Sequence, residues 1–388
     1  MQGKSGPSFS AVSAGVVSAI VGFTASFAIV LQGLTHMGAT PAEASSGLMA
    51  VAVAMGLGGI VLSLWRRMPI SVAWSTPGAA LLAVSTAPAG GFAEAVGAFV
   101  IAAVCAIVAS LWRPLGRLIE QIPPSIAQAM LAGILMPLCL VPVHAIAELP
   151  VYGVPIALTW LITGQMNRIA AVPAAVLVAV GMIAYQEDLS ALASADLITR
   201  PVIVVPEFSV SATIGIAIPL FIVTLASQNI PGIAVLNGFG YRPAPQPLFR
   251  VTGLFSLVAA PVGGHAVNLA AITAAICANE DADPNPARRY WSTVVAGVVY
   301  ILFGLAASMT VAFAALAPAL AIGAVAGLAL IGALAGAIAG AVADAEARVP
   351  AIITFLIAAS GVSIAGISGA FWGLCAGLLL YFLQRVKN

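Results

Sequence analysis

The chain has 388 residues, of which 62% are hydrophobic and only 7% are charged, and its mean hydropathy is +1.11. These values exclude an ordinary water-soluble domain, and a formal net charge of +1 gives no reason to expect a nucleic-acid partner. The long apolar runs lack strand-like alternation, so the sequence predicts an all-α polytopic membrane protein rather than a barrel.

Breaks between the apolar runs divide the chain into fourteen predicted spans. In chain order they are expected at residues 9–35, 45–65, 70–87, 91–111, 122–143, 149–164, 169–186, 209–236, 247–261, 263–279, 290–314, 316–342, 349–365 and 367–384. Cytoplasmic loops of such proteins collect Lys and Arg. With an inside N-terminus, thirteen of the 14 basic residues fall on the inner side, so we expect both termini to be cytoplasmic. The inner set is Lys4, Arg66, Arg67, Arg113, Arg117, Arg168, Arg242, Arg250, Arg288, Arg289, Arg348, Arg385 and Lys387, and Arg200 alone lies outside.

The outer loop after residue 186 divides the spans into two sets of seven. The first set occupies residues 8–186 and the second occupies residues 208–386. Because seven is odd, the second set must be inverted relative to the first. Inverted repeats with interrupted helices at matching positions are typical of secondary transporters, which bind their substrate near mid-membrane.

The third span is predicted to be extended first and helical second. It contains the stretch AWSTPGAALL, in which Ser75 and Thr76 offer capping oxygens and Pro77 suits a first helical turn. We therefore expect a half-helix that begins near Thr76–Gly78.

The tenth span has the same order, since the stretch PVGGHAVN precedes a clean helical run. Only 29 residues separate Arg250 from Glu280, whereas two helical crossings need about 40. An extended start relieves this shortage, because a strand rises about 3.3 Å per residue and a helix about 1.5 Å. Here we expect a half-helix that begins near His265–Asn268, with its N-terminus facing that of the third span, so that the two form an anion site.

Polar residues in the third, eighth and tenth spans are the predicted substrate-binding residues. We expect one cavity to contain them, with the aromatic rings of Phe27 or Trp74 as covers. The set is Ser75, Thr76, Gly78, Gln228, Asn229, His265 and Asn268.

His265 is the one deep titratable side chain apart from cysteines, and a buried ionisable residue in a membrane indicates function. We expect neutral imidazole in the empty site and imidazolium beside a bound carboxylate, so that proton and substrate bind cooperatively. Two alternatives stay open: His265 pairs structurally with a neighbouring span, or the proton rides on the substrate carboxylate. An intramembrane hydrolase using Ser227 and His265 lacks an acidic partner, so no enzyme is expected.

The motifs resemble those of the benzoate:proton symporter family of bacterial inner membranes. The stretches concerned are AWSTPGAALL at 73–82, ASQNIPGIAVL at 226–236, GGHAVNLAAITAAICA at 263–278 and DPNPARRYW at 283–291. This family is distantly similar to the uracil/xanthine nucleobase:cation symporters, which place substrate-binding glutamates where His265 and Gln228 stand here. The resemblance implies a core domain (8–111 plus 208–314) that moves against a gate domain (122–186 plus 316–386).

The resulting hypothesis is a carrier that imports benzoate or a similar aromatic carboxylate with a proton, without a cofactor or metal. It implies a multi-pass protein of the inner membrane whose partners are the substrate and membrane lipid. The oligomeric state stays open, with a homodimer as one option. The alternatives are a symporter or exchanger for another small anion or a nucleobase, and a passive channel.

Overall fold

The computed structural model describes residues 6–111, 123–194, 196–365 and 367–387, most of which are helical. The first half contains α1 (Phe9–Thr24), α2 (Phe27–His36), α3 (Pro41–Arg66), β1 (Val72–Trp74), α4 (Thr76–Val84), α5 (Phe92–Leu111), α7 (Pro124–Glu148), α8 (Pro150–Met166), α9 (Ala171–Gln186) and η1 (Leu189–Ser194). The second half contains α10 (Val210–Ala212), η2 (Thr213–Ala217), α11 (Ile218–Thr224), η3 (Leu225–Asn229), α12 (Ile230–Gly238), α13 (Pro245–Ala259), η4 (Ala260–Val262), β2 (Val267–Leu269), α14 (Ile272–Ala278), η5 (Pro286–Arg288), α15 (Tyr290–Leu305), α16 (Ala307–Leu316), α17 (Ala319–Val342), α18 (Arg348–Ala359), β3 (Ser363–Ile364), β4 (Ile367–Ser368) and α19 (Gly369–Lys387).

Every predicted span coincides with one or more of these elements. Among the described residues, six helical segments are long and apolar enough to cross a membrane, and a seventh arises if α15 and α16, bent by 57°, count as one. The chain is therefore a helical protein of the multi-pass membrane type, whereas the count of fourteen crossings stays a prediction. Lys4, Arg113 and Arg117, which the topology places inside, lie outside the described residues.

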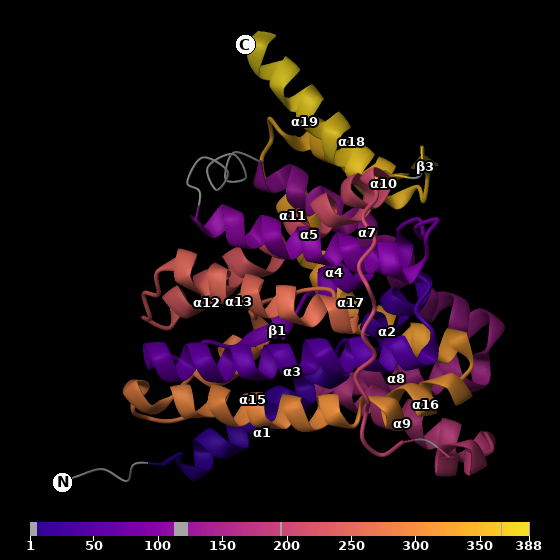
Figure 1. Ribbon diagram of the computed structural model, residues 1–388, viewed down its shortest axis with the longest axis vertical. Coiled ribbons are helices and arrows are strands. Elements are labelled where there is room, and N and C mark those ends of the chain that lie inside the picture. Colours follow the sequence, from indigo (N-terminus) through magenta and orange to yellow (C-terminus); the bar gives the residue numbers. More distant parts are fainter. Residues whose placement is uncertain (1–5, 112–122, 195, 366, 388) are drawn as a thin grey trace.

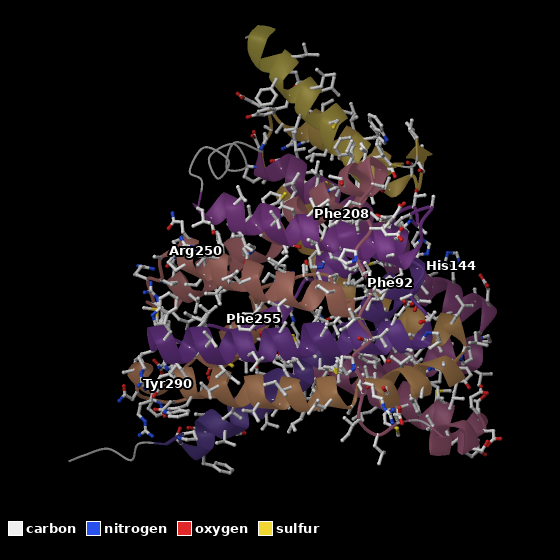
Figure 2. All side chains as sticks on the ribbon, in the orientation of Figure 1. Phe92, His144, Phe208, Arg250, Phe255 and Tyr290 are labelled. Carbon is white, nitrogen blue, oxygen red and sulfur yellow. The ribbon has the colours of Figure 1, made fainter. Side chains whose placement is uncertain are left out.

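Helices from both halves of the chain alternate in one stack. Figure 1 shows α5, α13, α3 and α15 in successive rows, and each of these helices contacts the next. The aromatic ring of Phe255, on α13, reaches Gly58 of α3, where a Cβ atom would lie 3.4 Å from it (Figure 2). In the same view Arg250, on α13, and His144, on α7, lie at opposite sides of the molecule.

A second set of helices packs mainly within itself. Helices α7, α8, α9, α17, α18 and α19 contact one another, and α17 and α7 form the most extensive helix pair. In Figure 1 the C-terminal helix α19 projects from the top of the molecule. These are the helices assigned to the gate domain from the sequence, and their movement as a domain stays a prediction.

The segment between the two halves is extended. It runs along the stack from η1 to α10 in Figure 1. Its backbone N–H groups donate to other elements, as in Val204 N–H to Pro261 O at 2.8 Å and Glu207 N–H to Ala93 O at 3.0 Å. Residues of this connection thus tie helices of the first half to helices of the second.

The eighth predicted span is one continuous helical rod that contains two wider π-helical turns, η2 and η3. Each π turn directly precedes a helix with a proline in its first turn, Pro219 in α11 and Pro231 in α12. A proline has no N–H to donate and crowds the carbonyl four residues earlier, so a wider turn accommodates it. The turn η3 carries Gln228 and Asn229.

Helices α3 and α15 approach closely at two glycines that face each other. A Cβ atom on Gly56 would lie 2.5 Å from Gly297 O, and one on Gly297 would lie 2.6 Å from Gly56 O. Small residues allow such close backbone contact between apolar helices, where van der Waals packing drives association. This contact joins a helix of the first half to one of the second.

We predict that Gly297→Leu destabilises the protein by about 1–3 kcal/mol, because the added side chain has no room beside the Gly56 carbonyl. Thermal unfolding of the detergent-solubilised protein measures the change. Gly332→Leu is the matched control, since a Cβ atom there has nothing within 4 Å in the described structure. Equal unfolding temperatures for the two variants would contradict the proposed close contact.

Candidate functional site

The two broken spans meet as a short antiparallel strand pair. Strand β1 pairs with β2, with Val72 opposite Leu269 and Trp74 opposite Val267. Two further backbone bonds extend the pairing, from Ser75 N–H to Ala266 O and from Ala270 N–H to Ser71 O, both at 2.9 Å. Unpaired backbone groups are costly in an apolar interior, so each extended segment satisfies the other.

The expected start of the second half-helix near His265–Asn268 is wrong, because α14 begins at Ile272. The first is correct, since α4 begins at Thr76. A helix begun at His265 would withdraw the backbone groups of residues 266–270 from β1. The sequence shows where helix is disfavoured but does not show that a partner strand prolongs the extended segment.

His265 lies between η4 and β2 and is completely buried. Its Nε2 is 3.0 Å from Ser75 O, and a carbonyl only accepts, so Nε2 must carry the hydrogen. The neutral ring then has its lone pair on Nδ1, which has no partner among the described residues. The ring of Phe99 packs edge-on against it, with centroids 6.4 Å apart.

Asn268 is the second buried polar group with an unused atom. Its Nδ2 donates to Leu269 O at 2.8 Å, whereas its Oδ1 has no partner in the described structure. Because strand residues alternate, Asn268 points to the face opposite Val267 and Leu269. Most buried polar atoms in proteins are hydrogen-bonded, so the two unpartnered atoms of His265 and Asn268, three residues apart in the tenth span, favour a partner that enters from outside.

Ser75 caps α4 and links it to the eighth span. Its Oγ accepts from Gly78 N–H at 3.1 Å and lies 2.8 Å from Thr224 Oγ1. With Pro77 lacking an N–H, the first turn of α4 offers Thr76 N–H as its free donor within the described structure. The capped helix end is therefore less open to an anion than the sequence pattern alone predicts.

Asn229 joins the eighth span to the strand pair, since its Oδ1 accepts from Leu269 N–H at 2.9 Å. Its neighbour Gln228 is half-buried and has no hydrogen bond within the described residues. Gly78 packs against Leu220, whose Cδ1 would be 2.5 Å from a Cβ atom there. The structure thus gathers Ser75, Asn229, His265 and Asn268 around the strand pair. Thr76, Gly78 and Gln228 lie at the margins of the strand pair.

The expected aromatic covers differ in their surroundings. Trp74 is buried, packs against Phe23 with centroids 5.3 Å apart, and donates from Nε1 to Ser26 Oγ at 2.7 Å. Phe27 stacks on the same Phe23 at 5.8 Å and lines an apolar cavity of about 370 Å³ between α1, α2, α9, α16 and α17. None of the seven predicted binding residues lines that cavity.

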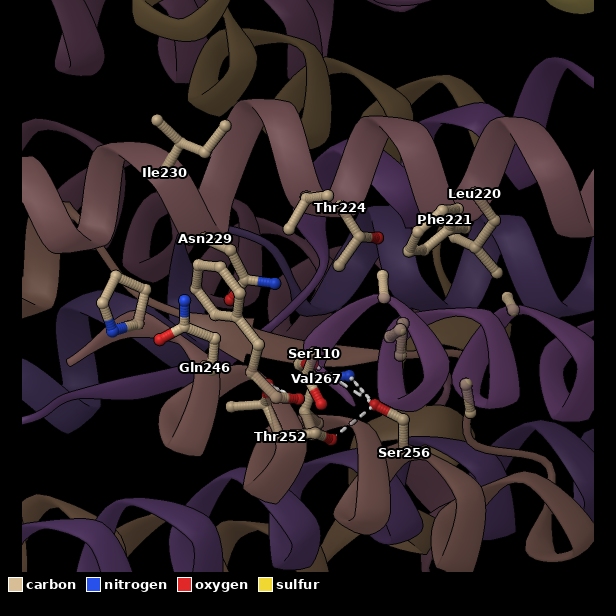
Figure 3. A pocket seen from close by; sticks show the side chains of 18 residues that line it. Ser110, Leu220, Phe221, Thr224, Asn229, Ile230, Gln246, Thr252, Ser256 and Val267 are labelled. Atoms are coloured by element: carbon tan, nitrogen blue, oxygen red, sulfur yellow. Dashed lines mark hydrogen bonds between the residues drawn. The ribbon is translucent and has the colours of Figure 1, made fainter. Parts of the chain in front are cut away.

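A larger cavity of about 400 Å³ lies beside the strand pair, between α5, α11, η3, α12, α13 and β2. Of the seven predicted residues, Asn229 lines it and the other six do not. Figure 3 shows Asn229 and Gln246 at one end of this cavity and Leu220 and Phe221 at the other. The expectation that one cavity holds all seven residues is therefore not met by these two cavities.

Several polar residues that support the strand pair were not identified from the sequence. Ser256 Oγ accepts from Val267 N–H at 2.9 Å, and Ser71 Oγ lies 2.9 Å from Thr273 Oγ1. Thr224, which contacts Ser75, stands five residues before Asn229, one turn apart across the π-helical segment. The sequence signal that could have identified Thr224 is a pair of polar residues, Thr224 and Asn229, about one helical turn apart inside an apolar span.

The stretch DPNPARRYW anchors the far end of α14. Arg289 is buried and donates from Nη1 to Ala278 O at 2.8 Å and from Nε to Asp283 O at 2.7 Å. Although burial raises the pKa of the Asp283 carboxyl, hydrogen bonds from Ser8 and Asn285 and the positive charges of Arg288 and Arg289 outweigh it, and the pKa lies below its usual value. The half-helix is thus fixed at its C-terminus by charged groups.

The family model described as "Benzoate membrane transport protein" matches residues 6–383. The chain belongs to this family. It is 37% identical over 377 residues to the inner membrane protein YdcO of Escherichia coli, covering 96% of this chain and 95% of that protein. It is 33% identical over 376 residues to the benzoate membrane transport protein of Acinetobacter baylyi, covering 97% and 95%. The resemblance inferred from the sequence motifs is confirmed.

Solved transporters share the fold of this family member. The transmembrane domain of the cyanobacterial bicarbonate transporter BicA superposes with a TM-score of 0.61 at 14% identity, over 97% of each chain. SLC26A9 gives a TM-score of 0.61 at 13% identity, over 96% of this chain and 65% of that one. The family description, the Acinetobacter baylyi relative and BicA are named as transport proteins, which is consistent with the expectation of a non-enzyme. Ser227 makes no hydrogen bond to His265 in the described structure.

We predict that Asn229→Ala lowers the free energy of unfolding by about 1–3 kcal/mol, because it leaves the buried N–H of Leu269 without an acceptor. Gln228→Ala, at the next position, serves as control and should leave stability nearly unchanged. Thermal unfolding in detergent compares the two variants with the parent. A larger loss of stability for Gln228→Ala than for Asn229→Ala would contradict this account of the strand pair.

Proposed function

We propose that this protein imports benzoate or a similar aromatic carboxylate together with a proton, by alternating access across the bacterial inner membrane. The observation that carries the proposal is the buried pair of unused acceptors, His265 Nδ1 and Asn268 Oδ1, at the crossing of two broken spans in a member of the benzoate transport family. A proton taken up with the substrate supplies the hydrogen that a buried acceptor lacks.

The forced tautomer of His265 gives this idea a chemical form. With the Nε2 hydrogen held by Ser75 O, Nδ1 is the ring atom that can gain a proton. An imidazolium that donates to a carboxylate and a neutral imidazole that accepts from a carboxylic acid differ by the position of one proton. A proton on His265 and a proton on the substrate carboxylate therefore describe the same complex of substrate, proton and His265.

Electrostatics favour such coupling. The membrane potential opposes the uptake of an anion by about 2.3 kcal/mol per charge for each 100 mV, and a proton carried with it cancels this term. The side chains gathered at the strand pair, Ser75, Asn229, His265 and Asn268, include no carboxylate that would repel the substrate.

Binding requires a change of conformation, because both orphan atoms are buried under neighbouring side chains. A movement of the predicted core domain against the gate helices would open the strand pair to one side at a time. The extended segment that precedes α10 and the loop holding Asp283 join elements of the core, so the core can move as one body.

We predict that proteoliposomes containing the purified protein accumulate radiolabelled benzoate when the lumen is made alkaline relative to the outside. A proton ionophore should abolish the accumulation, because the gradient drives it. Substituted benzoates should compete, whereas uracil should not. Uptake that continues unsaturated after the gradient collapses would indicate a channel, and competition by uracil alone would indicate a nucleobase carrier.

A second prediction concerns His265. In the parent protein, benzoate affinity should fall as pH rises from about 5.5 to 7.5, the range around the ordinary histidine pKa of about 6.5, because the protonated ring is the form that binds a carboxylate. His265→Gln should make affinity independent of pH in this range. His36→Gln is the control, since His36 contacts Ser85 O away from the strand pair. If the His265→Gln variant keeps the parent's pH profile, the proton is carried elsewhere.

A further inference from the structure

The larger cavity borders the proposed transport site and shares Asn229 with it, but the rest of its lining differs. His265 Nδ1 and Asn268 Oδ1 do not reach it, and Asn268 points to the opposite face of β2 from Val267, which does line it. Its volume of about 400 Å³ falls within the range of roughly 300–1,000 Å³ typical of small-molecule pockets. Gln246, at the start of α13, and Ile230, at the start of α12, are its exposed lining residues.

The lining of this cavity favours an uncharged ligand. No Lys, Arg, His, Asp or Glu stands among the described residues that form it. An ionised group buried there would have no countercharge, and such burial costs several kcal/mol even after relaxation. This separates the cavity from the proposed transport site, where His265 can meet a carboxylate.

The walls specify the shape of the ligand. On α5, alanines give a smooth surface at one-turn spacing, and Phe221 and Phe249 approach from the other helices. These alanines are Ala102, Ala103, Ala106 and Ala109. Small residues opposite aromatic rings leave a space suited to a planar ring.

The polar groups specify the ligand's head group. Asn229 Nδ2 and the Gln246 amide have no hydrogen-bond partner within the described structure, and Figure 3 shows both at one end of the cavity. The hydroxyls of Ser110 and Thr252 donate to backbone carbonyls, which leaves their lone pairs as acceptors. A primary carboxamide, which both donates and accepts, matches this combination.

The cavity is connected to the strand pair through its own walls. Asn229 holds Leu269 N–H, Ser256 holds Val267 N–H, and Thr224 holds the Ser75 hydroxyl that caps α4. All three polar side chains line the cavity. A ligand that binds there fixes these side chains, and so it stabilises one arrangement of β1 and β2 over others.

We propose that this cavity is a second binding site, which takes an uncharged aromatic carboxamide and whose occupancy inhibits transport by holding the strand pair in its present arrangement. Benzamide is the probe, because it has the ring and size of benzoate and carries no charge. Binding to the purified full-length protein is measured by calorimetry, and its effect on benzoate uptake is measured in proteoliposomes.

Ala106→Phe fills the cavity from α5, and Val104→Phe is the matched control, since Val104 is 42% exposed and does not line the cavity. We expect benzamide to bind the parent and Val104→Phe alike, and to bind Ala106→Phe at least tenfold more weakly. In the parent, benzamide should lower the maximal rate of benzoate uptake without raising its KM. Ala106→Phe should keep benzoate uptake and lose this inhibition.

The proposal would be overturned if the parent does not bind benzamide, or if benzamide inhibits the parent and Ala106→Phe equally and competitively. It would also be overturned if native mass spectrometry detects a copurified lipid in the parent that is absent from Ala106→Phe. If Ala106→Phe does not fold, Gln246→Leu at the exposed mouth decides, with an expected loss of about threefold to tenfold in benzamide affinity. An unchanged affinity there contradicts the site. The binding comparison remains valid if the protein does not transport benzoate, so the two proposals can fail separately.

Discussion

The rest of the structure depends on one constraint: backbone N–H and C=O groups away from water must find partners. Helices satisfy this internally, but the third and tenth spans each begin without a helix. The pairing of β1 with β2 resolves both defects at once, because each strand supplies the donors and acceptors that the other lacks. The contacts of Ser256 with Val267 and of Asn229 with Leu269 complete the pairing from two neighbouring spans.

This pairing also explains why polar side chains gather at the centre of an apolar protein. Side chains that support a strand pair must be able to donate or accept hydrogen bonds, and Ser256, Thr224 and Asn229 can do so. His265 and Asn268 differ from the others, because each keeps one buried atom without a partner in the described structure. An unpaired buried polar atom costs stability, and a ligand that pairs with it recovers that free energy. The strand pair is therefore both a structural support and the place where the proposed substrate would bind.

The larger cavity lies beside this support, and three of its polar lining residues, Thr224, Asn229 and Ser256, hold the strand pair. A ligand in that cavity that contacts Thr224, Asn229 or Ser256 would act on the strand pair through their hydrogen bonds. Meanwhile the second cavity, lined almost wholly by apolar side chains, borders the helices assigned to the gate. The two spaces differ in chemistry because one faces the broken spans and the other faces only helices.

The sequence by itself determined the membrane class, the approximate positions of the apolar segments and the start of α4, because hydropathy, capping residues and proline act locally. It also indicated the family, through motifs that directly specify the broken spans. Only the tertiary structure decided that β2 continues to Leu269 and delays α14 to Ile272, since that depends on a partner strand about 200 residues away, as Ser71 and Thr273 show with a sequence separation of 202. The support from Thr224 and Ser256 was likewise decided by packing, because polar residues inside an apolar span indicate a contact but do not show which distant span they bond to.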